Sequence, residues 1–517
     1  MTFNSSPINI GSRREVFWDD FLLETENNGP AGIFRITEQA EILLQEPQKK
    51  EIVLRLDKPW EGKACGYFHY FHDGEKFRFY YRASAGLSAE PHGISHISKK
   101  ASICVIISDD GIHWERPDLG LVEFNGNKNN NIIFSGDELD NFFVFKDANP
   151  ACRPDELYKA ITQGRRTPEQ PSGGLLIYVS PDGFSWQPAS SPIRGLDFGS
   201  QKHFFDSLNT AHWDPVIGMY RLYYRGFHEA GNSGRFRDIR LALSPDFYNW
   251  EDKGLLCYGA AGDIQLYTNG ILPYCRAPQR LVGFPVRYTE RKWEPMFDQL
   301  PHREWRLEKM NRFSEPRLGT ALTDCLFMTG NDGINFTRYD EAFLKPGIFG
   351  EYNWVYGDCY QGWGLLETRQ EDSGTQELSF FAGEDYTSQP VGIRRYTIRP
   401  DGFACLCAGD SERQIVTKPF IFSGNILALN MSTSAAGFVM AEFLYPDGSP
   451  VSGFSGESGY RMFGDNLEIR TLFRRGNKDS GGTASSDVSS LEGKPVRIRF
   501  TLRDAKLYSM CFSGAGL

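Results

Sequence analysis

The sequence predicts an all-β protein: a five-bladed β-propeller followed by a C-terminal β-sandwich. Three observations support this prediction. Of the 517 residues, 14% are aromatic, 53 are glycine and 28 are proline, and aromatic side chains favour strands while glycine and proline mark turns. Few segments show helical periodicity. A short turn-like motif also recurs five times, at intervals of 72, 64, 86 and 69 residues between its aspartates. These intervals suit a four-stranded blade better than a helical repeat.

The recurring motif, called the box below, contains an aspartate that follows an apolar β-run. The copies are SDDGIHW (108–114), SPDGFSW (180–186), SPDFYNW (244–250), GNDGINF (330–336) and RPDGF (399–403). An aspartate can bind neighbouring backbone amides, a glycine can take a positive φ, and the aromatic residue can fold back on the hairpin. We therefore interpret the box as a structural turn between the last two strands of a blade, rather than as a calcium or catalytic site.

Two further strand-like runs precede each box, which completes a blade of four strands. They are 66–72 and 76–82; 141–146 and 156–163; 207–213 and 219–225; 265–273 and 280–288; and 360–368 and 377–382. The segment 14–24 reads as one more strand, which we expect to close the ring by pairing with the last blade. The regular box spacing disfavours the alternative of separate β-sandwiches.

The repeat stops after Ala408, and the chain from Val416 onward alternates without a box. Alternating strands with glycine-rich turns are typical of a sandwich. We therefore expect an N-terminal segment with the ring-closing strand (1–59), a catalytic propeller (60–410) and a sandwich (411–517).

Charge and motifs exclude several classes of protein. The net charge of −10 and the lack of a basic run argue against nucleic-acid binding. No apolar window is long enough for a membrane span. The N-terminus lacks a secretory signal, so we expect a cytoplasmic protein with its ten cysteines reduced. The histidine pairs 69/72 and 92/96 lack metal-binding partners, and no phosphate-loop, dinucleotide or serine-hydrolase motif is present. We expect no metal and no cofactor.

Propeller topology sorts the remaining polar residues by face. First strands line the central channel, and their starts lie on the same face as the ends of second strands. Carboxylates recur near the start of four first strands: Glu61, Asp206, Asp263 and Asp358. A pair of carboxylates is what hydrolysis of a glycosidic bond requires. Any one of these carboxylates could instead cap a turn. The prediction of a catalytic site therefore depends on their recurrence at the same topological position in four blades. We expect Asp206, Asp263 and Asp358 to share the catalytic roles.

Arginines end second strands on the same face: Arg82, Arg225 and Arg287, with 165–166 nearby in the second blade. They can pair with the carboxylates or bind an anionic group of a substrate. The three arginines and the three aspartates bring six charges of alternating sign to a narrow channel mouth. We expect these charges mostly to form ion pairs with one another, and we therefore expect the substrate to be a neutral sugar. Long loops on this face (83–100, 226–237 and 289–319) favour a binding site there.

Other residues near this face are candidates for contact with a sugar. Tyr267 and Trp363 could stack on a sugar ring, although packing between blades is an equal alternative, as it is for Trp213 and Tyr360. His212 lies on a channel-lining strand, and Asp20 lies in the WDDF segment. The expected substrate-binding set is therefore Arg82, Arg225, Arg287, His212, Tyr267, Trp363, Glu61 and Asp20.

The blade pattern, the acids at the channel mouth and the trailing sandwich resemble the propeller glycoside hydrolases, particularly the five-bladed invertase-like and arabinanase-like group. The segments FWDDFLLE, FDSLNTAHWDP, LTDCLFMTGNDGINF and GKPVRIRFTLRDAKLYSMCF resemble parts of bacterial proteins related to that group. The invertase signatures WMNDPNG, RDP and EC are not present as such. Asp20 and Asp206 are loose counterparts of the first two, and no EC dipeptide exists. The boxes also resemble those of sialidases, which have six blades and three arginines.

The resemblance implies a glycoside hydrolase that cleaves a terminal sugar at the channel mouth. Two alternatives stay open: a sialidase-like hydrolase of an acidic sugar, with the arginines binding its carboxylate, and a non-catalytic carbohydrate-binding propeller. Several carboxylates gathered at one mouth argue against a scaffold, because burying them together is unfavourable unless they are paired or functional.

Overall fold

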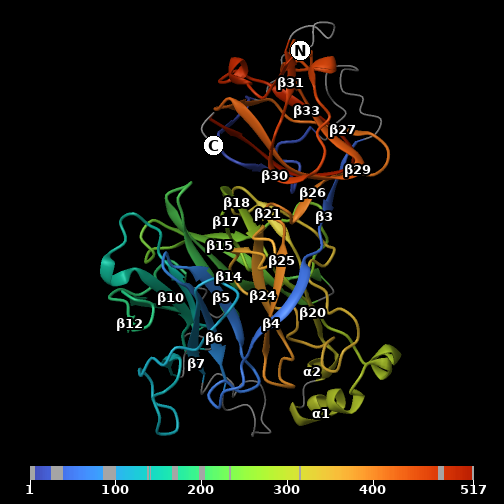
Figure 1. Cartoon of the computed structure of the whole chain (residues 1–517). Helices are drawn as coiled ribbons and strands as arrows, with labels where there is room; N and C mark the ends of the chain where they lie inside the picture. The colour runs from blue at the N-terminus through green and yellow to red at the C-terminus, as the bar shows by residue number, and fades with distance from the viewer. Residues whose placement is uncertain are drawn as a thin grey trace. The chain divides into compact units, whose positions relative to one another are not determined.

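The computed structural model describes residues 6–24, 39–84, 101–136, 139, 141–165, 173–196, 204–231, 234–313, 316–475 and 483–514. The chain forms two compact units: Glu46–Ile398, and Met1–Gln45 together with Arg399–Leu517. The first unit is the predicted five-bladed propeller and the second contains the predicted sandwich (Figure 1). The predicted loops 83–100 and 226–237 lie partly outside the described residues, and His92 and His96 lie wholly outside them.

Five four-stranded antiparallel sheets form the blades. Blade 1 contains β5 (Gly66–His72), β6 (Phe77–Ala83), β7 (Ser102–Ser108) and β8 (Ile132–Ser135). Blade 2 contains β9 (Phe143–Lys146), β10 (Tyr158–Gln163), β11 (Leu175–Ser180) and β12 (Gln187–Pro188). Blade 3 contains β13 (Thr210–Asp214), β14 (Met219–Glu229), β15 (Arg235–Ser244) and β16 (Glu251–Leu255). Blade 4 contains β17 (Leu272–Tyr274), β18 (Ala277–Gly283), β21 (Met328–Gly330) and β22 (Phe336–Arg338). Blade 5 contains β23 (Leu366–Arg369), β24 (Gln376–Glu384), β25 (Gly392–Ile398) and β4 (Gln48–Arg55).

The strand that closes the ring differs from the predicted one. β4 pairs antiparallel with β25, so an N-terminal strand supplies the outer edge of the last blade. Figure 1 shows β4, in blue, beside β25, in orange. The predicted segment 14–24 instead lies in the other unit, where β2 (Glu15–Val16) pairs with β33 (Arg497–Ser513). Both segments alternate as a strand should, and alternation alone does not reveal the partner.

Blade 4 carries an insertion between its second and third strands. The hairpin of β19 (Val286–Thr289) and β20 (Leu322–Cys325) encloses two helices, α1 (Arg303–Phe313) and α2 (Arg317–Thr320). This insertion is the predicted long loop 289–319. The first strands of blades 4 and 5 are shorter than predicted, because only the ends of 265–273 and 360–368 are regular strands.

Four of the five boxes form the predicted turn between third and fourth strands. In each, one carboxylate oxygen of the aspartate accepts hydrogen bonds from two following backbone amides, at 2.8–2.9 Å. The aspartates are Asp110, Asp182, Asp246 and Asp332. All four lie on the turn that leaves the third strand, opposite the starts of the first strands.

Two of the boxes also attach their blade to the preceding one. In blade 1, Arg78 Nη1 donates to the carbonyl of Asp182 at 2.5 Å, and the Tyr80 hydroxyl donates to the carbonyl of Gly183 at 3.3 Å. In blade 3, an arginine and a tyrosine two residues apart, Arg221 and Tyr223, bind the box of blade 4 in the same way. An Arg-x-Tyr pair on a second strand is therefore an inter-blade latch.

The fifth copy is not a blade turn. Since β4 supplies the fourth strand of blade 5, the chain after β25 leaves the propeller at this point. Asp401 is fully buried in the other unit, where it accepts hydrogen bonds from Asn430 at 3.1 Å and Ser509 at 2.6 Å and pairs with Arg14 at 3.2 Å. The interpretation of Asp401 as a box was wrong.

The second unit is built on two long bent strands, β29 (Ile426–Leu444) and β33, which pair along both arms. Further strands extend this sheet: β2, β3 (Glu41–Leu44), β26 (Ala404–Ala408), β27 (Arg413–Val416) and β30 (Asp465–Arg470). Two small sheets complete the unit: β1 (Ile8–Gly11) with β28 (Phe420–Phe422), and β31 (Phe473–Arg475) with β32 (Thr483–Ser485). The apolar faces enclose one core that includes Phe17, Phe443 and Phe512. The N-terminal strands therefore belong to the sandwich.

Candidate functional site

Trp363 packs where segments of several blades meet. Its indole Nε1 donates to the carbonyl of Ile271 at 2.7 Å, its ring packs 5.1 Å from that of Phe143, and its backbone carbonyl accepts from the amide of Tyr70 at 2.9 Å. These contacts join the channel-lining segments of blades 1, 2 and 4. Only 8% of Trp363 is exposed, so the residue is packed between blades, which is the alternative that the sequence left equal to sugar stacking.

Arginines and tyrosines from blades 3 and 4 and from the segment between blades 4 and 5 lie close together. We call Arg225 (β14), Arg237 (β15), Tyr267, Tyr288 (β19) and Tyr356 the arginine–tyrosine cluster. The Arg225 guanidinium lies 4.5 Å from the centre of the Tyr267 ring, and that of Arg237 lies 4.5 Å from the centre of the Tyr288 ring. The hydroxyl of Tyr356 donates to that of Tyr267 at 2.9 Å. Cations over aromatic faces are favourable contacts.

The two arginines of the cluster have neutral partners. Arg225 donates to the backbone carbonyl of Tyr267, and Arg237 donates to the side chain of Gln265. Among the described residues, no carboxylate lies within ion-pair distance of either guanidinium. Burial lowers the pKa of Arg225, which is 4% exposed, and the charge of Arg237 lowers it further, while Tyr267 and Asp206 act in the opposite direction. Two neighbouring positive charges therefore lie at the channel mouth without a carboxylate paired to either of them.

Asp206 is the predicted catalytic residue that lies near this cluster. The amide of the preceding Phe205 donates to the carbonyl of Arg225 at 3.0 Å, which brings the two segments together. The negative charge of Asp206 stabilises the charged form of Arg225. Asp206 is partly exposed.

Asp263 lies in a different place, at the surface. Its carboxylate is 2.8 Å from Nε2 of His228, whose Nδ1 is 3.2 Å from Asp238. Although burial disfavours the charged imidazole, the hydrogen bonds and charges of the two aspartates raise the pKa of His228. The side chain of Asp263 is 54% exposed, so its environment is that of a surface ion pair and differs from that of Asp206.

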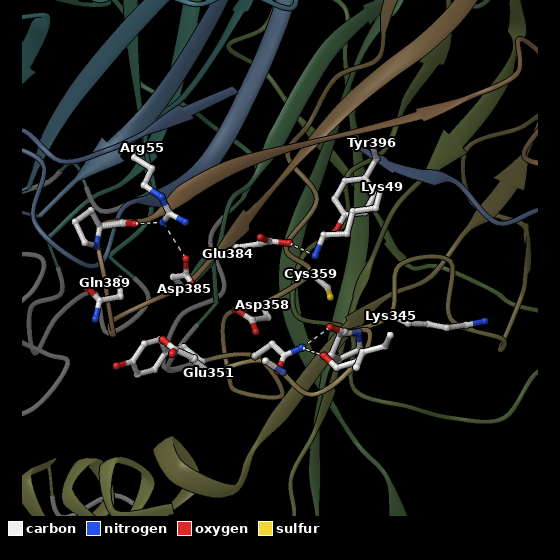
Figure 2. Close-up of a pocket in the computed structure, with 16 residues that line it drawn as sticks. Lys49, Arg55, Lys345, Glu351, Asp358, Cys359, Glu384, Asp385, Gln389 and Tyr396 are labelled. Carbon is white, nitrogen blue, oxygen red and sulfur yellow. Dashed lines mark hydrogen bonds and ion pairs between the residues drawn. The ribbon is translucent and has the colours of Figure 1, made fainter. Parts of the chain in front are cut away.

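Asp358 lies in a third place, beside a cavity of about 660 Å³ on the flank of blade 5 (Figure 2). It is 4% exposed, and its Oδ1 has no hydrogen-bond partner among the described residues. Burial, with the nearby charges of Glu384 and Asp385, raises the pKa of Asp358 well above its ordinary value, against the opposing effect of Lys309 and Arg306. The three predicted catalytic aspartates therefore have three separate environments.

The three predicted arginines also differ in their surroundings. Arg225 belongs to the cluster. Arg82 donates to the carbonyl of Ala64 at 2.9 Å and lies 4.8 Å from the ring centre of Tyr67, at the start of a channel-lining strand. Arg287 forms a two-pronged ion pair with Asp324 of the neighbouring strand, with Nε at 2.9 Å from Oδ1. Arg287 is thus a paired residue on the other side of its strand from Tyr288.

Three other candidates, Glu61, His212 and Asp20, have different surroundings. Glu61 is fully buried and accepts two hydrogen bonds from Arg116, at 2.8 and 2.9 Å, and one from Tyr81 at 2.5 Å. Burial lowers the pKa of His212 to about 3, so its ring is neutral, and neither ring nitrogen has a partner among these residues. Asp20 is an exposed residue of the sandwich unit, and its backbone carbonyl accepts from Lys418 at 3.0 Å.

Sequence reasoning did not select Arg237, Tyr288 or Tyr356. Arg237 ends the predicted polar loop 226–237, so its position on the mouth-facing side was a usable signal. Tyr288 and Tyr356 lie in and near the blade 4 insertion, and no local pattern distinguishes them from core tyrosines.

The described residues contain no group of three or more metal-ligating His, Cys, Asp or Glu side chains. Within the same residues, no helix has the length and apolar character needed to cross a membrane.

No family model and no curated protein matches the chain. Solved structures that resemble it include a glycoside hydrolase with 13% identity, covering 69% of this chain and 93% of that one with a TM-score of 0.43. A family 32 β-fructofuranosidase from Bombyx mori has 11% identity, covers 91% and 95%, and gives a TM-score of 0.37. A glycosyl hydrolase from Bacteroides ovatus has 15% identity, covers 75% and 97%, and gives a TM-score of 0.36.

Proposed function

We propose that the chain is a glycoside hydrolase that binds a terminal sugar bearing an anionic group at the mouth of its propeller channel. The observation that carries this proposal is the pair Arg225 and Arg237, two adjacent guanidiniums whose hydrogen-bond partners among the described residues are neutral. Two converging cations that repel each other are unfavourable unless a ligand neutralises them. A carboxylate is the natural ligand, because the planar guanidinium binds it with two parallel hydrogen bonds.

This substrate class departs from the neutral sugar that the sequence predicted. That prediction expected Arg82, Arg225 and Arg287 mostly to pair with carboxylates. Arg287 does so with Asp324, whereas Arg225 and the further arginine Arg237 have no carboxylate within ion-pair distance among the described residues. The tyrosines beside them offer flat apolar faces, which suit the C–H face of a sugar ring.

We further infer that the site is a blind pocket, because Trp363 packs between blades and donates a hydrogen bond to the carbonyl of Ile271. This inference favours action on a terminal sugar. A sugar at the end of a glycan can enter such a pocket, whereas an internal sugar needs an open groove.

Asp206 is the carboxylate that we propose for the chemical step. It lies beside Arg225 and is partly exposed, so it can reach a bound sugar and accept a proton or attack the anomeric carbon. Asp263 is paired with His228 at the surface, and Asp358 lies beside the separate cavity. Neither of these two is proposed as its catalytic partner.

Paired substrates test the proposed charge preference. Hydrolysis of aryl hexuronides and of the matching neutral aryl hexosides is measured for the wild type, Arg225→Ala, Arg237→Ala and the control Arg287→Ala. Losing a charge-assisted hydrogen bond is worth about 1.5–3 kcal/mol, so we expect kcat/KM on the acidic substrates to fall roughly 10- to 100-fold in the first two variants. The control should stay within about threefold of the wild type.

Faster hydrolysis of the neutral series by the wild type would contradict the anionic substrate. Binding of acidic sugars with no hydrolysis of any substrate would instead support the alternative of a carbohydrate-binding propeller. Asp206→Asn, with Asp263→Asn as its control, tests the chemical role: only the first change should lower kcat, by about 100-fold or more.

A further inference from the structure

The cavity beside Asp358 is a site distinct from the arginine–tyrosine cluster, since none of the cluster residues lines it. It lies between the outer strands of blade 5, which contribute Lys49 and Tyr396, and the segment 345–353 (Figure 2). Its volume of about 660 Å³ falls within the range of small-molecule binding sites.

The charges that line this cavity are largely neutralised within the protein. Lys49 pairs with Glu384 at 2.5 Å, and Arg55 pairs with Asp385 at 2.9 Å. Figure 2 shows both pairs on one wall of the cavity. Lys345 pairs with Glu341 at 3.4 Å. A strongly charged ligand would therefore lie close to charges of both signs, so attraction and repulsion would largely cancel and its net electrostatic binding energy would be small.

Asp358 is the polar group that this wall leaves incompletely bonded. It faces the cavity near Glu384 and Asp385 (Figure 2), and Arg306 and Lys309 of α1 and the thiol of Cys359 lie near it. No described guanidinium or ammonium group forms an ion pair with it, and its Oδ1 is buried without a hydrogen-bond partner among the described residues. Burial and the neighbouring carboxylates raise the pKa of Asp358 and so favour its protonated form, which both donates and accepts a hydrogen bond.

We propose that this cavity binds a neutral sugar, with the Asp358 carboxyl hydrogen-bonded to its hydroxyl groups. Vicinal hydroxyls donate and accept at close spacing, which matches a carboxyl group, the outer lone pairs of the two ion pairs and the Gln389 amide. An anion would approach Glu384, Asp385 and Glu351, and a cation would approach Lys49 and Arg55.

The rim adds apolar surface suited to one face of such a ligand. Ile348 lines the cavity with 94% of its surface exposed. Exposed apolar side chains at the edge of a polar cavity are typical of binding sites.

Binding of methyl glycosides of glucose, galactose, mannose, xylose and arabinose to the full chain tests the proposal, by calorimetry and by NMR saturation transfer. Glucuronate and glucosamine are the charged comparisons. We expect at least one neutral glycoside to bind the wild type. Asp358→Ala should weaken it about tenfold or more, the effect of one lost buried hydrogen bond. Asp358→Asn should stay within about threefold, because an amide also donates and accepts.

Two further variants keep the test independent of folding and of the proposed function. Gln389→Trp places a bulky ring at an exposed position of the rim and should abolish binding even if Asp358→Ala does not fold. Arg225→Ala, at the channel mouth, should leave neutral-sugar binding unchanged. The proposal is overturned if none of the neutral glycosides binds, if a charged comparison binds more tightly, if Gln389→Trp binds normally, or if Arg225→Ala abolishes binding. Loss of kcat with intact binding in Asp358→Asn would also overturn it, in favour of a catalytic role.

Discussion

At the scale of single residues, the behaviour of a charge is decided by its partner. Lys309 on α1 is an example: it donates to the hydroxyl of Thr387 at 2.6 Å and has no carboxylate within ion-pair distance among the described residues. Burial lowers the pKa of Lys309 to about 7, with Asp358 opposing the shift and Arg306 adding to it. The protein therefore carries a lysine that loses its proton near neutral pH.

This shift predicts a pH dependence of stability. Between pH 7 and the ordinary lysine value of 10.5, the unfolded chain holds a proton that folded Lys309 has released. The unfolded state binds more protons, so the free energy of unfolding rises with pH in this interval, by at most about 1.4 kcal/mol per unit. Lys309→Met removes this contribution. In urea unfolding at pH 6, 7, 8 and 9, the wild type should therefore gain stability relative to Lys309→Met above pH 7.

The exposed Lys345→Met serves as the control and should differ from the wild type by a constant amount. A difference between wild type and Lys309→Met that does not change from pH 7 to 9 would show that Lys309 stays charged in the folded protein.

At the scale of elements, the boxes explain how neighbouring blades are joined and why one box lacks its glycine. The glycines of the second and fourth boxes, Gly183 and Gly333, have φ of +76° and +92° and lie against the arginine of the preceding blade. In the third box, Phe247 takes the glycine position, with φ of +71°. The preceding blade there carries Lys159 instead of an arginine, with its ammonium group 5.9 Å from the centre of the Phe247 ring. The third box therefore lacks its glycine at the one of these blade junctions where a lysine replaces the arginine.

The latch predicts a large cost for a small substitution. A Cβ on Gly333 would lie 1.5 Å from Nη1 of Arg221, so Gly333→Ala must displace this guanidinium from the carbonyl of Asp332. Gly218→Ala is the matched control, because its φ is also positive, at +64°, but its Cβ would meet nothing within 4 Å. We expect denaturant unfolding to show a loss of about 1–2 kcal/mol for the control and about 2–5 kcal/mol for Gly333→Ala. Equal losses would mean that the latch adds no stability.

At the scale of the whole propeller, two sets of contacts join blades that are distant in sequence: a strand pairing that closes the ring, and the packing of Trp363 between blades. β4 completes blade 5 from the N-terminal side, so the first and last strands of the propeller pair with each other. Trp363 joins the channel-lining segments of blades 1, 2 and 4 at the axis. Both contacts connect segments that are far apart in the sequence, by 92 residues for Trp363 and Ile271 and by more for the others.

Trp363 gives a prediction that separates packing from sugar binding. Trp363→Ala should lower the free energy of unfolding by about 3–5 kcal/mol, and Trp363→Phe should lose about 1 kcal/mol or more with the hydrogen bond to Ile271. Trp213→Ala, at a half-buried position whose ring contacts Tyr220, should cost less. If Trp363→Phe instead keeps full stability and raises KM, Trp363 is a sugar-binding residue, as the sequence first indicated.

The sequence by itself determined the all-β class, the five blades, the sandwich and the turn formed by four boxes. These features follow from strand alternation and from hydrogen bonds between residues two or three positions apart. Both depend only on residues that are close in sequence, so a short stretch of sequence is enough to predict them. It also placed Arg225, Asp206 and Tyr267 near the channel mouth.

Only the tertiary structure decided which charges are paired. Glu61 binds Arg116, Arg287 binds Asp324, and Arg225 is left with the neutral carbonyl of Tyr267. It also decided that the ring closes with β4 rather than 14–24, and that Asp401 belongs to the sandwich core. The physical reason is the same in each case: an ion pair or a strand pairing depends on a partner that is distant in sequence, and turning a side chain to the opposite face of its strand changes that partner completely.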